Sequence, residues 1–185
     1  MNPADRVRRL VLTGPEATAK TTLAAEVGRR LGAPVVFEYA RAYAERVRRP
    51  LTADDVEPIA RGQIAAEDEA LEQARAVADV RRRLLVLDTD LVSTVIYARY
   101  YYGACPEWIE RAARERLGDL YVLLEPDLPW VADGVRDLPQ GREDIRRALR
   151  ECLGAATARV VEVGGTGEER LRQVLGLAER LPMQS

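Results

Sequence analysis

Residues 7–22 read Val-Arg-Arg-Leu-Val-Leu-Thr-Gly-Pro-Glu-Ala-Thr-Ala-Lys-Thr-Thr, an apolar strand-like run followed by a turn that ends in Lys-Thr. Lys20 is the only lysine among 28 basic residues, so this position requires a compact ammonium group where a planar guanidinium would not fit. Leu23, Val27 and Leu31 follow at helical spacing. A strand, a turn with this lysine and a helix indicate a phosphate-binding loop, whose lysine reaches the β- and γ-phosphates of a nucleotide.

This loop predicts which residues hold ATP and Mg²⁺. Backbone amides at the start of the helix would cradle phosphate oxygens, and the Thr21 hydroxyl would ligate Mg²⁺. The predicted nucleotide-binding residues are Gly14, Glu16, Ala17, Thr18, Ala19, Lys20, Thr21 and Thr22. Ala19 replaces the second glycine of the motif, and we expect its methyl group to be tolerated only if its backbone φ is negative. The alternative interpretation is an ordinary strand–turn–helix with a solvated lysine.

Length, charge and composition narrow the class of protein. We expect a single domain over residues 1–185. The balance of 28 basic and 30 acidic residues argues against broad nucleic-acid binding. No stretch has the length of a membrane span or the pattern of a secretion signal, so we expect a cytoplasmic protein with no membrane partner. The oligomeric state is left open.

The chain contains no histidine, and this limits its chemistry. A general base must be a carboxylate, a perturbed thiol or water, and a Ser-His-Asp nucleophile is excluded. Cys105 and Cys152 form neither a disulfide framework nor a zinc cluster, and we expect two ordinary thiols.

Short apolar runs alternate with longer helical patterns along the chain. The predicted strands are residues 7–13, 34–37, 84–88, 119–124 and 159–163, and the predicted helices lie near 20–31, 40–48, 53–80, 91–102, 106–116, 142–153 and 168–181. Thr52 with Asp55, and Thr166 with Glu169, are predicted to cap two helix starts. The strand runs are apolar throughout, which favours an α/β fold with a parallel five-stranded sheet and helices on both faces.

Carboxylates at the predicted strand ends suggest catalytic roles, because ligands bind at that edge of a parallel sheet. Asp88 follows four apolar residues and is predicted to hold Mg²⁺, although many strands simply end in an aspartate. Asp90 either faces the same site or caps the next helix. Glu38, with Arg41 one helical turn away, is the predicted general base; the alternative is a surface ion pair.

Three further segments are assigned roles near the reacting phosphate. Residues 127–147 are polar and contain Gly and Pro, and we predict a lid whose Arg136 and Arg142 close over the phosphoryl group; a solvated loop and helix is the alternative. The Gly-rich residues 164–167 would pass near the nucleotide base. Of the clustered tyrosines Tyr97, Tyr100, Tyr101 and Tyr102, we expect at least two in the core and allow one in a substrate pocket.

Several blocks of this sequence resemble the ribosylnicotinamide kinase domain of the NadR family. They are GPEATAKTTLA from residue 14, FEYARAYAER from 37, IARGQIAAEDEAL from 59, LDTDLVSTVIYARYYYG from 87, DLYVLLEPDLPWVADGVR from 119 and VEVGG from 161. The resemblance runs from about residue 8 to 178 and implies a P-loop fold related to nucleoside and nucleotide kinases. It also implies transfer of the ATP γ-phosphate to the 5′-hydroxyl of nicotinamide riboside, giving nicotinamide mononucleotide.

The resemblance also assigns individual residues. Gly14, Lys20 and Thr21 would hold ATP and Mg²⁺, and Asp88 would be the Walker B acid. Phe37 stands where some members have a tryptophan that stacks on the nicotinamide ring. The phosphate loop begins at residue 14, so we do not expect the adenylyltransferase domain of fused members, nor synthesis of NAD from the mononucleotide.

The sequence is therefore compatible with two classes of function, a kinase and a regulatory ATP-binding switch. As a kinase, the chain would use catalytic residues Lys20, Glu38, Arg136 and Arg142, substrate-binding residues Phe37, Glu38, Tyr39, Arg41 and Asp90, and metal ligands Thr21 and Asp88. As a regulatory ATP-binding switch, it would use the same loop without a phosphoryl acceptor. A kinase of another nucleoside or small metabolite is also open. A GTPase is disfavoured because the guanine-reading motif needs a second lysine.

Overall fold

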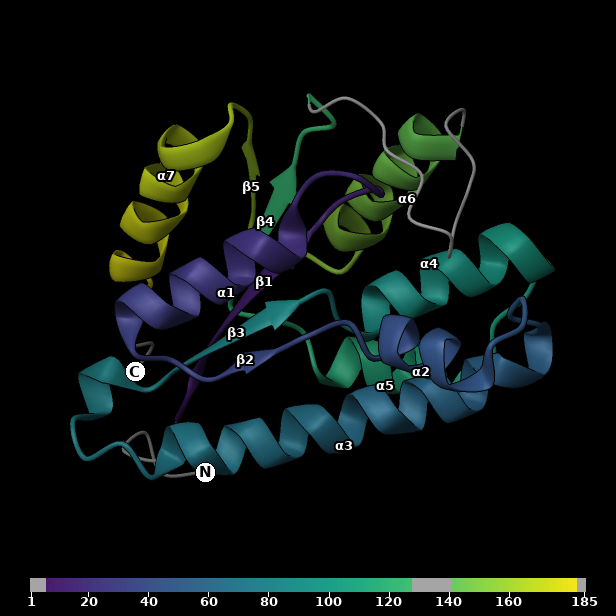
Figure 1. The fold of residues 1–185 in the computed structure, drawn as a ribbon, viewed down its shortest axis with the longest axis horizontal. Coiled ribbons are helices and arrows are strands. Elements are labelled where there is room, and N and C mark those ends of the chain that lie inside the picture. Colours follow the sequence, from purple (N-terminus) through teal and green to yellow (C-terminus); the bar gives the residue numbers. More distant parts are fainter. Residues whose placement is uncertain (1–5, 128–140, 183–185) are drawn as a thin grey trace.

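Five parallel strands form one sheet in the computed structural model, which describes residues 6–127 and 141–182. The strands are β1 (Arg8–Thr13), β2 (Val35–Val36), β3 (Leu84–Asp88), β4 (Leu120–Leu124) and β5 (Val160–Val163). Their order across the sheet is β2-β3-β1-β4-β5, with β1 in the centre (Figure 1). The predicted five-stranded parallel sheet is confirmed, and every strand lies within its predicted range.

Helices cover both faces of the sheet, and each face has its own apolar layer (Figure 1). Side chains alternate along β1, so Leu10 and Leu12 pack in the layer of α1 (Lys20–Leu31) and α7 (Gly167–Glu179). Val11 belongs to the layer on the other face. That layer includes residues of α3 (Val56–Arg75), α4 (Leu91–Tyr102), α5 (Glu107–Glu115) and α6 (Arg142–Ala155). The short α2 (Tyr39–Val47) packs against α3.

One predicted helix, residues 53–80, is shorter in the structure. The chain there forms a 3₁₀ turn at Ala53–Asp55, then α3, then a second 3₁₀ turn at Val80–Arg82. The predicted cap at its start is confirmed, since Asp55 Oδ2 accepts the Thr52 backbone N–H at 2.8 Å. Near its end, the Asp79 carboxylate accepts the Arg81 N–H at 3.0 Å. This local hydrogen bond takes the place of a helical backbone hydrogen bond, and the chain changes direction here before it enters β3.

The predicted cap at the start of α7 is wrong, although the helix itself is present. Thr166 occupies the N-cap position but makes no capping hydrogen bond through its side chain. Gly167, the first helical residue, has a left-handed φ of 54°, which is unlike the first turn that a capping box requires. The apolar stripe of α7 is as predicted, with Leu171, Val174 and Ala178 buried against the sheet.

No helix within the described ranges is both long enough and apolar enough to cross a bilayer.

Candidate active site

The loop after β1 folds tightly around its own carbonyl groups. Gly14 has φ 145° and lies so close to β4 that an added Cβ would be 2.9 Å from the Leu124 carbonyl oxygen. The buried Thr18 hydroxyl donates to the Pro15 carbonyl at 3.0 Å. Lys20 Nζ donates to the Gly14 and Pro15 carbonyls at 3.0 and 2.8 Å. The lysine is therefore held over the loop, and the helix N-terminus lies beside it, as an anion site requires.

The expectation for the backbone of Ala19 is wrong. Ala19 has φ 60° and ψ 28°, a left-handed conformation, and Ala17 shares it with φ 55°. Ala19 is the N-cap of α1, and its carbonyl accepts the Leu23 N–H at 3.0 Å, although N-cap residues usually have an extended backbone. An alanine in this region costs roughly 1–2 kcal/mol relative to a right-handed residue. The methyl group is thus accommodated at the expense of backbone strain.

Thr21 and Asp88 come together at the carboxyl end of β3. The Thr21 hydroxyl donates to Asp88 Oδ2 at 2.6 Å. Asp88 is 1% exposed, and its Oδ1 has no hydrogen-bond partner among the described residues. A buried carboxylate oxygen without a partner, beside a hydroxyl, is suited to a hard cation such as Mg²⁺. The described residues contain no group of three or more acidic, Cys or His ligands, so the remaining ligands would be water and phosphate oxygens.

The electrostatic surroundings of Asp88 connect it to the predicted base. Burial raises the pKa of Asp88, while the hydrogen bond from Thr21 and the charge of Lys20 act in the opposite direction. The charge of Glu38 also raises it, and that of Arg41 lowers it. The charged residues predicted from the ends of β1, β2 and β3 therefore act on one another at this edge of the sheet.

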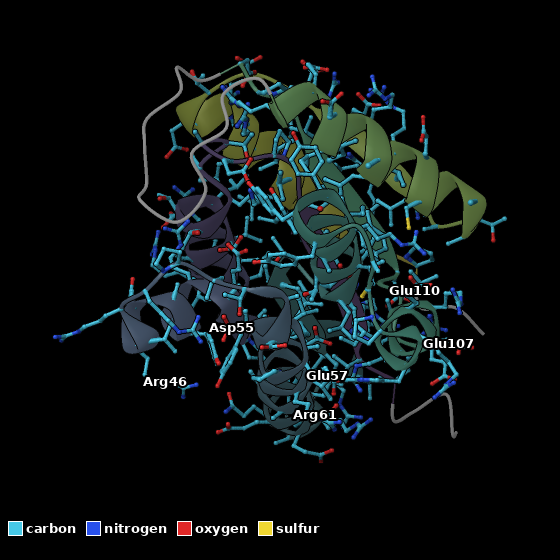
Figure 2. The ribbon with its side chains drawn as sticks, turned by 90° about the vertical axis from the view of Figure 1, so that its right-hand side faces the viewer. Arg46, Asp55, Glu57, Arg61, Glu107 and Glu110 are labelled. Atoms are coloured by element: carbon cyan, nitrogen blue, oxygen red, sulfur yellow. The ribbon has the colours of Figure 1, made fainter. Side chains whose placement is uncertain are left out.

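A cavity of about 720 Å³ adjoins this edge, between α2, the start of α3 and α4. Figure 2 shows this end of the molecule, with Asp55 at the start of α3 and Arg46 on α2. The cavity wall combines charged, small and aromatic side chains. Its lining includes Glu38, Arg41, Thr89, Ser93, Gln63, Tyr97, Tyr101 and Tyr102. A space of this size, lined by both apolar and polar side chains, is typical of a small-molecule site.

The structure separates the predicted substrate residues. Glu38 and Arg41 line the cavity, whereas Phe37 and Tyr39 are not part of its wall. Phe37 is 49% exposed. The Tyr39 ring packs on α3 over Gly62, where an added Cβ would lie 2.1 Å from the ring.

Aromatic residues of the cavity come instead from α4. Tyr97 and Tyr101 stack with their ring centroids 6.1 Å apart and their planes at 11°. The expectation that at least two of the clustered tyrosines are core residues is wrong, since only Tyr97 is buried, while Tyr100, Tyr101 and Tyr102 are 37–40% exposed. One turn of helix separates Tyr97 from Tyr101, so both rings lie on the same side of α4.

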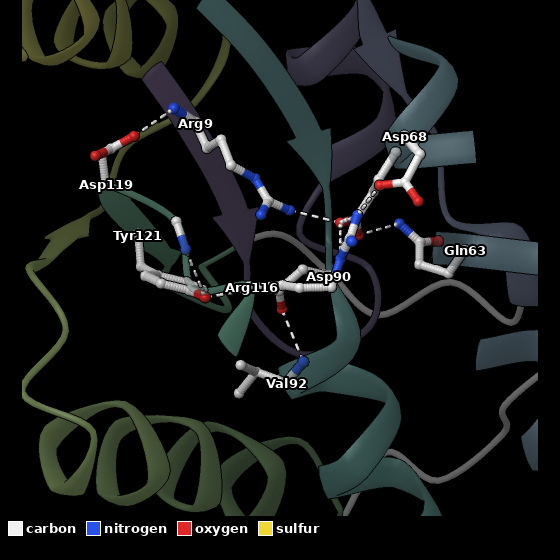
Figure 3. Close-up of polar contacts among 10 residues, drawn as sticks. Arg9, Gln63, Asp68, Asp90, Val92, Arg116, Asp119 and Tyr121 are labelled. Atoms are coloured by element: carbon white, nitrogen blue, oxygen red, sulfur yellow. Dashed lines mark hydrogen bonds and ion pairs between the residues drawn. The ribbon is translucent and has the colours of Figure 1, made fainter. Parts of the chain in front are cut away.

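Asp90 is buried and is not part of the cavity wall; Figure 3 shows its polar contacts. Its Oδ1 accepts the Val92 N–H at 3.0 Å, which caps α4. Its Oδ2 accepts the Tyr121 hydroxyl at 2.6 Å. Burial raises the pKa of Asp90 to about 6. The capping alternative is confirmed, and the substrate-binding role predicted for Asp90 has no support from its position.

A buried polar network lies behind the cavity wall and includes Gln63, which lines the cavity. The sequence patterns did not reveal this network. Glu67 of α3 is fully buried and accepts hydrogen bonds from Arg9 of β1 at 2.5 Å and from Arg116 at 3.3 Å (Figure 3). It also accepts from Gln63 at 3.1 Å, and Gln63 Oε1 in turn accepts the Tyr39 N–H at 3.1 Å. The only sequence signal is a Gln and a Glu four residues apart on one side of a helix.

Only part of the predicted lid, residues 127–147, can be described. Arg136 lies outside the described residues. Arg142 is the first residue of α6, and it does not line the cavity. The lid and its two arginines therefore stay a prediction.

Comparison with known proteins places the chain in a family. Residues 9–170 match the sequence model of the family described as AAA domain. The chain belongs to this AAA domain family. Two curated relatives of this AAA domain are the proteins named trifunctional NAD biosynthesis/regulator protein NadR, from Salmonella typhimurium and Escherichia coli. The sequences are 30% identical over 151 and 155 residues, or 80% of this chain, which spans about a third of each relative (35% and 36%).

Solved structures show the same fold as this AAA domain. NadR in complex with NAD and AMP-PNP matches with a TM-score of 0.78 and 20% identity, over 97% of this chain and 50% of that one. NadR in complex with NR matches with a TM-score of 0.75 and 22% identity, over 97% and 52%. Thymidylate kinase from Ehrlichia chaffeensis matches with a TM-score of 0.65 and 12% identity, over 92% and 98%. The predicted resemblance to NadR and the P-loop kinase fold are confirmed.

Proposed function

We propose that this protein is an ATP-dependent kinase that phosphorylates nicotinamide riboside to nicotinamide mononucleotide. The observation that carries the proposal is the cavity at the sheet edge that also carries the phosphate loop, because a kinase needs an acceptor site near its nucleotide site. Glu38 belongs to the cavity wall and its charge raises the pKa of Asp88, which supports a role for this carboxylate near both sites. The similarity to NadR supports the choice of acceptor.

Each residue has a distinct role in the proposed reaction. Glu38 accepts the proton of the acceptor hydroxyl, and Arg41 orients that carboxylate. The ammonium of Lys20 neutralises charge on the transferred phosphoryl group, and the amides of residues 16–22 hold the phosphates in place. Thr21 and Asp88 would hold Mg²⁺, which when bound supplies charge neutralisation at the phosphate oxygens. Arg136 and Arg142 would complete this neutralisation from the lid.

The cavity also suits the proposed acceptor chemically. Nicotinamide riboside carries a planar, positively charged ring, and the faces of aromatic side chains attract such cations. Tyr97 and Tyr101, whose rings stack on each other, line the cavity and would supply such an aromatic surface. Phe37, which precedes Glu38, stays a predicted stacking residue, although it lies outside the cavity wall.

A regulatory ATP-binding switch would need no acceptor site, and the cavity therefore favours the kinase. Another nucleoside or small metabolite is the alternative acceptor. A cytoplasmic location, where ATP is available, belongs to the same proposal.

A coupled ADP-release screen tests this function. Purified protein with Mg²⁺ and ATP is offered nicotinamide riboside and a panel of other nucleosides, and we expect nicotinamide riboside to give the highest kcat/KM. Lys20→Ala is expected to abolish the release of ADP, and Glu38→Gln to lower kcat by ~10² or more with little change in ATP affinity. Release of ADP that no nucleoside stimulates would favour the regulatory switch. A higher kcat/KM with another nucleoside would identify that nucleoside as the acceptor in place of nicotinamide riboside.

A further inference from the structure

Because β1 is the central strand, the phosphate loop that follows it has different neighbours on its two sides. The loop follows the central strand β1, and on the side of β3 and β2 lie Asp88, Glu38 and the acceptor cavity. On the side of β4 and β5 lie two short segments, residues 125–127 and 164–166, which follow those strands. If the phosphates bind in the loop and the acceptor binds on the first side, the nucleoside half of ATP would extend toward the second.

Arg170, in the first turns of α7, joins the segments of this second side to the phosphate loop. Its Nη1 donates to the Thr18 carbonyl at 2.8 Å, and its Nη2 donates to the Glu125 carbonyl at 3.2 Å. The same Nη2 forms an ion pair with the carboxylate of Asp127. The other oxygen of Asp127 accepts the Gly165 N–H at 2.6 Å. A continuous path of polar contacts thus runs from the phosphate loop to the loop after β5.

Close packing ties the same segments together a second time. An added Cβ at Gly164 would lie 2.9 Å from the Glu125 carboxylate, so the loop after β5 passes directly against the end of β4. Gly165 has φ 82°, a conformation that favours glycine. The two segments are therefore direct neighbours, and the hydrogen bonds of Arg170 join the segment after β4 to the phosphate loop.

The burial of Arg170 indicates that its role is more than helix packing. The residue is 3% exposed, and a buried guanidinium is costly unless several acceptors surround it. The next residues on this side of α7, Leu171, Val174 and Ala178, pack against the sheet with apolar side chains. Burial alone would raise the pKa of Asp127, but the hydrogen bond and the charge of Arg170 lower it, so this carboxylate is ionised at neutral pH.

We propose that Arg170 and Asp127 form a clamp that positions the nucleoside half of ATP relative to its phosphates. The clamp acts through the Thr18 carbonyl on one side and through Gly165 on the other, and its two members are positioning residues. This inference rests on the proposed binding of ATP. It predicts that loss of the clamp weakens recognition of the nucleoside while binding of the bare phosphate chain and of the acceptor is largely kept.

Calorimetric titration with two probes tests the clamp. Wild-type protein, Arg170→Gln, Asp127→Ala and the double variant are each titrated with Mg²⁺-AMP-PNP and with Mg²⁺-tripolyphosphate, which lacks a nucleoside. We expect each single variant to lose about tenfold in affinity for AMP-PNP and less than threefold for tripolyphosphate, with the double variant no weaker than the weaker single one. Arg172→Gln, two residues further along α7 and exposed, is the matched control and should change neither affinity.

The outcomes separate the clamp from the proposed function. Failure of the wild type to bind AMP-PNP would refute ATP binding and the clamp with it. Binding by the wild type together with equal losses for both probes, or no loss, in Arg170→Gln would overturn the clamp alone. Arg170→Lys keeps the charge but reaches fewer acceptors, and it should show the same selective loss to a smaller extent. It replaces the glutamine variant if that variant does not fold.

Discussion

At the scale of single residues, Ala19 shows how a motif position can carry strain. Its left-handed φ of 60° is a conformation in which glycine has no penalty. We therefore expect Ala19→Gly to raise the free energy of unfolding by up to ~1 kcal/mol, measured by thermal or urea unfolding without nucleotide. ATP affinity, measured by calorimetry, should be equal or tighter.

An alanine inside α1, the helix that Ala19 caps, is the control for this prediction. Ala25 is exposed in the middle of α1, where the backbone is right-handed. Ala25→Gly should lower the stability by about 1 kcal/mol, because glycine loses more backbone freedom in a helix. The two substitutions are chemically identical, and their effects on the free energy of unfolding should have opposite signs. A loss of stability in both would show that the strain at Ala19 is relieved in some other way.

At the scale of elements, Glu67 joins α3 to β1 and to Arg116, which follows α5 (Figure 3). Removal of its charge leaves two arginines short of a buried partner. We expect Glu67→Gln to lower the free energy of unfolding in urea by about 3 kcal/mol. Asp68→Asn is the control, because Asp68 pairs with the same Arg116 but has a 56% exposed side chain, and it should cost less than ~1 kcal/mol. Similar losses in both variants would mean that burial does not decide the strength of these pairs.

At the scale of the whole molecule, Asp90 gives stability a dependence on pH. Its pKa of about 6 in the folded protein exceeds that of an unfolded aspartate, so the folded state binds this proton more tightly. The resulting contribution is complete below about pH 4 and is lost as the pH rises through 6. We expect the difference in unfolding free energy between the wild type and Asp90→Asn to shift against the wild type between pH 4 and pH 7.

Unfolding of both proteins in urea at several pH values measures this difference, and other carboxylates cancel in it. Asp55 is one of these carboxylates: its pKa is lowered chiefly by the hydrogen bond from Arg49, so its contribution is lost mainly below about pH 4, outside this range, and is the same in both proteins. A difference that is flat from pH 4 to pH 7 would contradict the prediction.

The amino-acid sequence by itself determined the strands, the sheet type and the identity of the phosphate loop. These follow from local patterns: fully apolar runs for a sheet covered on both faces, helical spacing after Lys20, and a lone lysine in a turn. Glu38 and Asp88 were predicted to share one edge because the carboxyl ends of parallel strands meet there, and Thr21 was predicted from the phosphate-loop pattern. In each case the deciding interaction is between neighbours in the chain or follows from the rule of parallel strands.

Only the tertiary structure decided what lies around that edge. The conformation of Ala19 depends on how the loop meets α1, and the direction of Asp90 depends on Tyr121, a residue 31 positions away. The tyrosines of the cavity wall, the buried Glu67 and the clamp of Arg170 on Thr18, 152 positions apart, all depend on such distant contacts. A pattern of neighbouring residues cannot specify these contacts, because the folded chain chooses a polar side chain's partner from elements that only packing brings together.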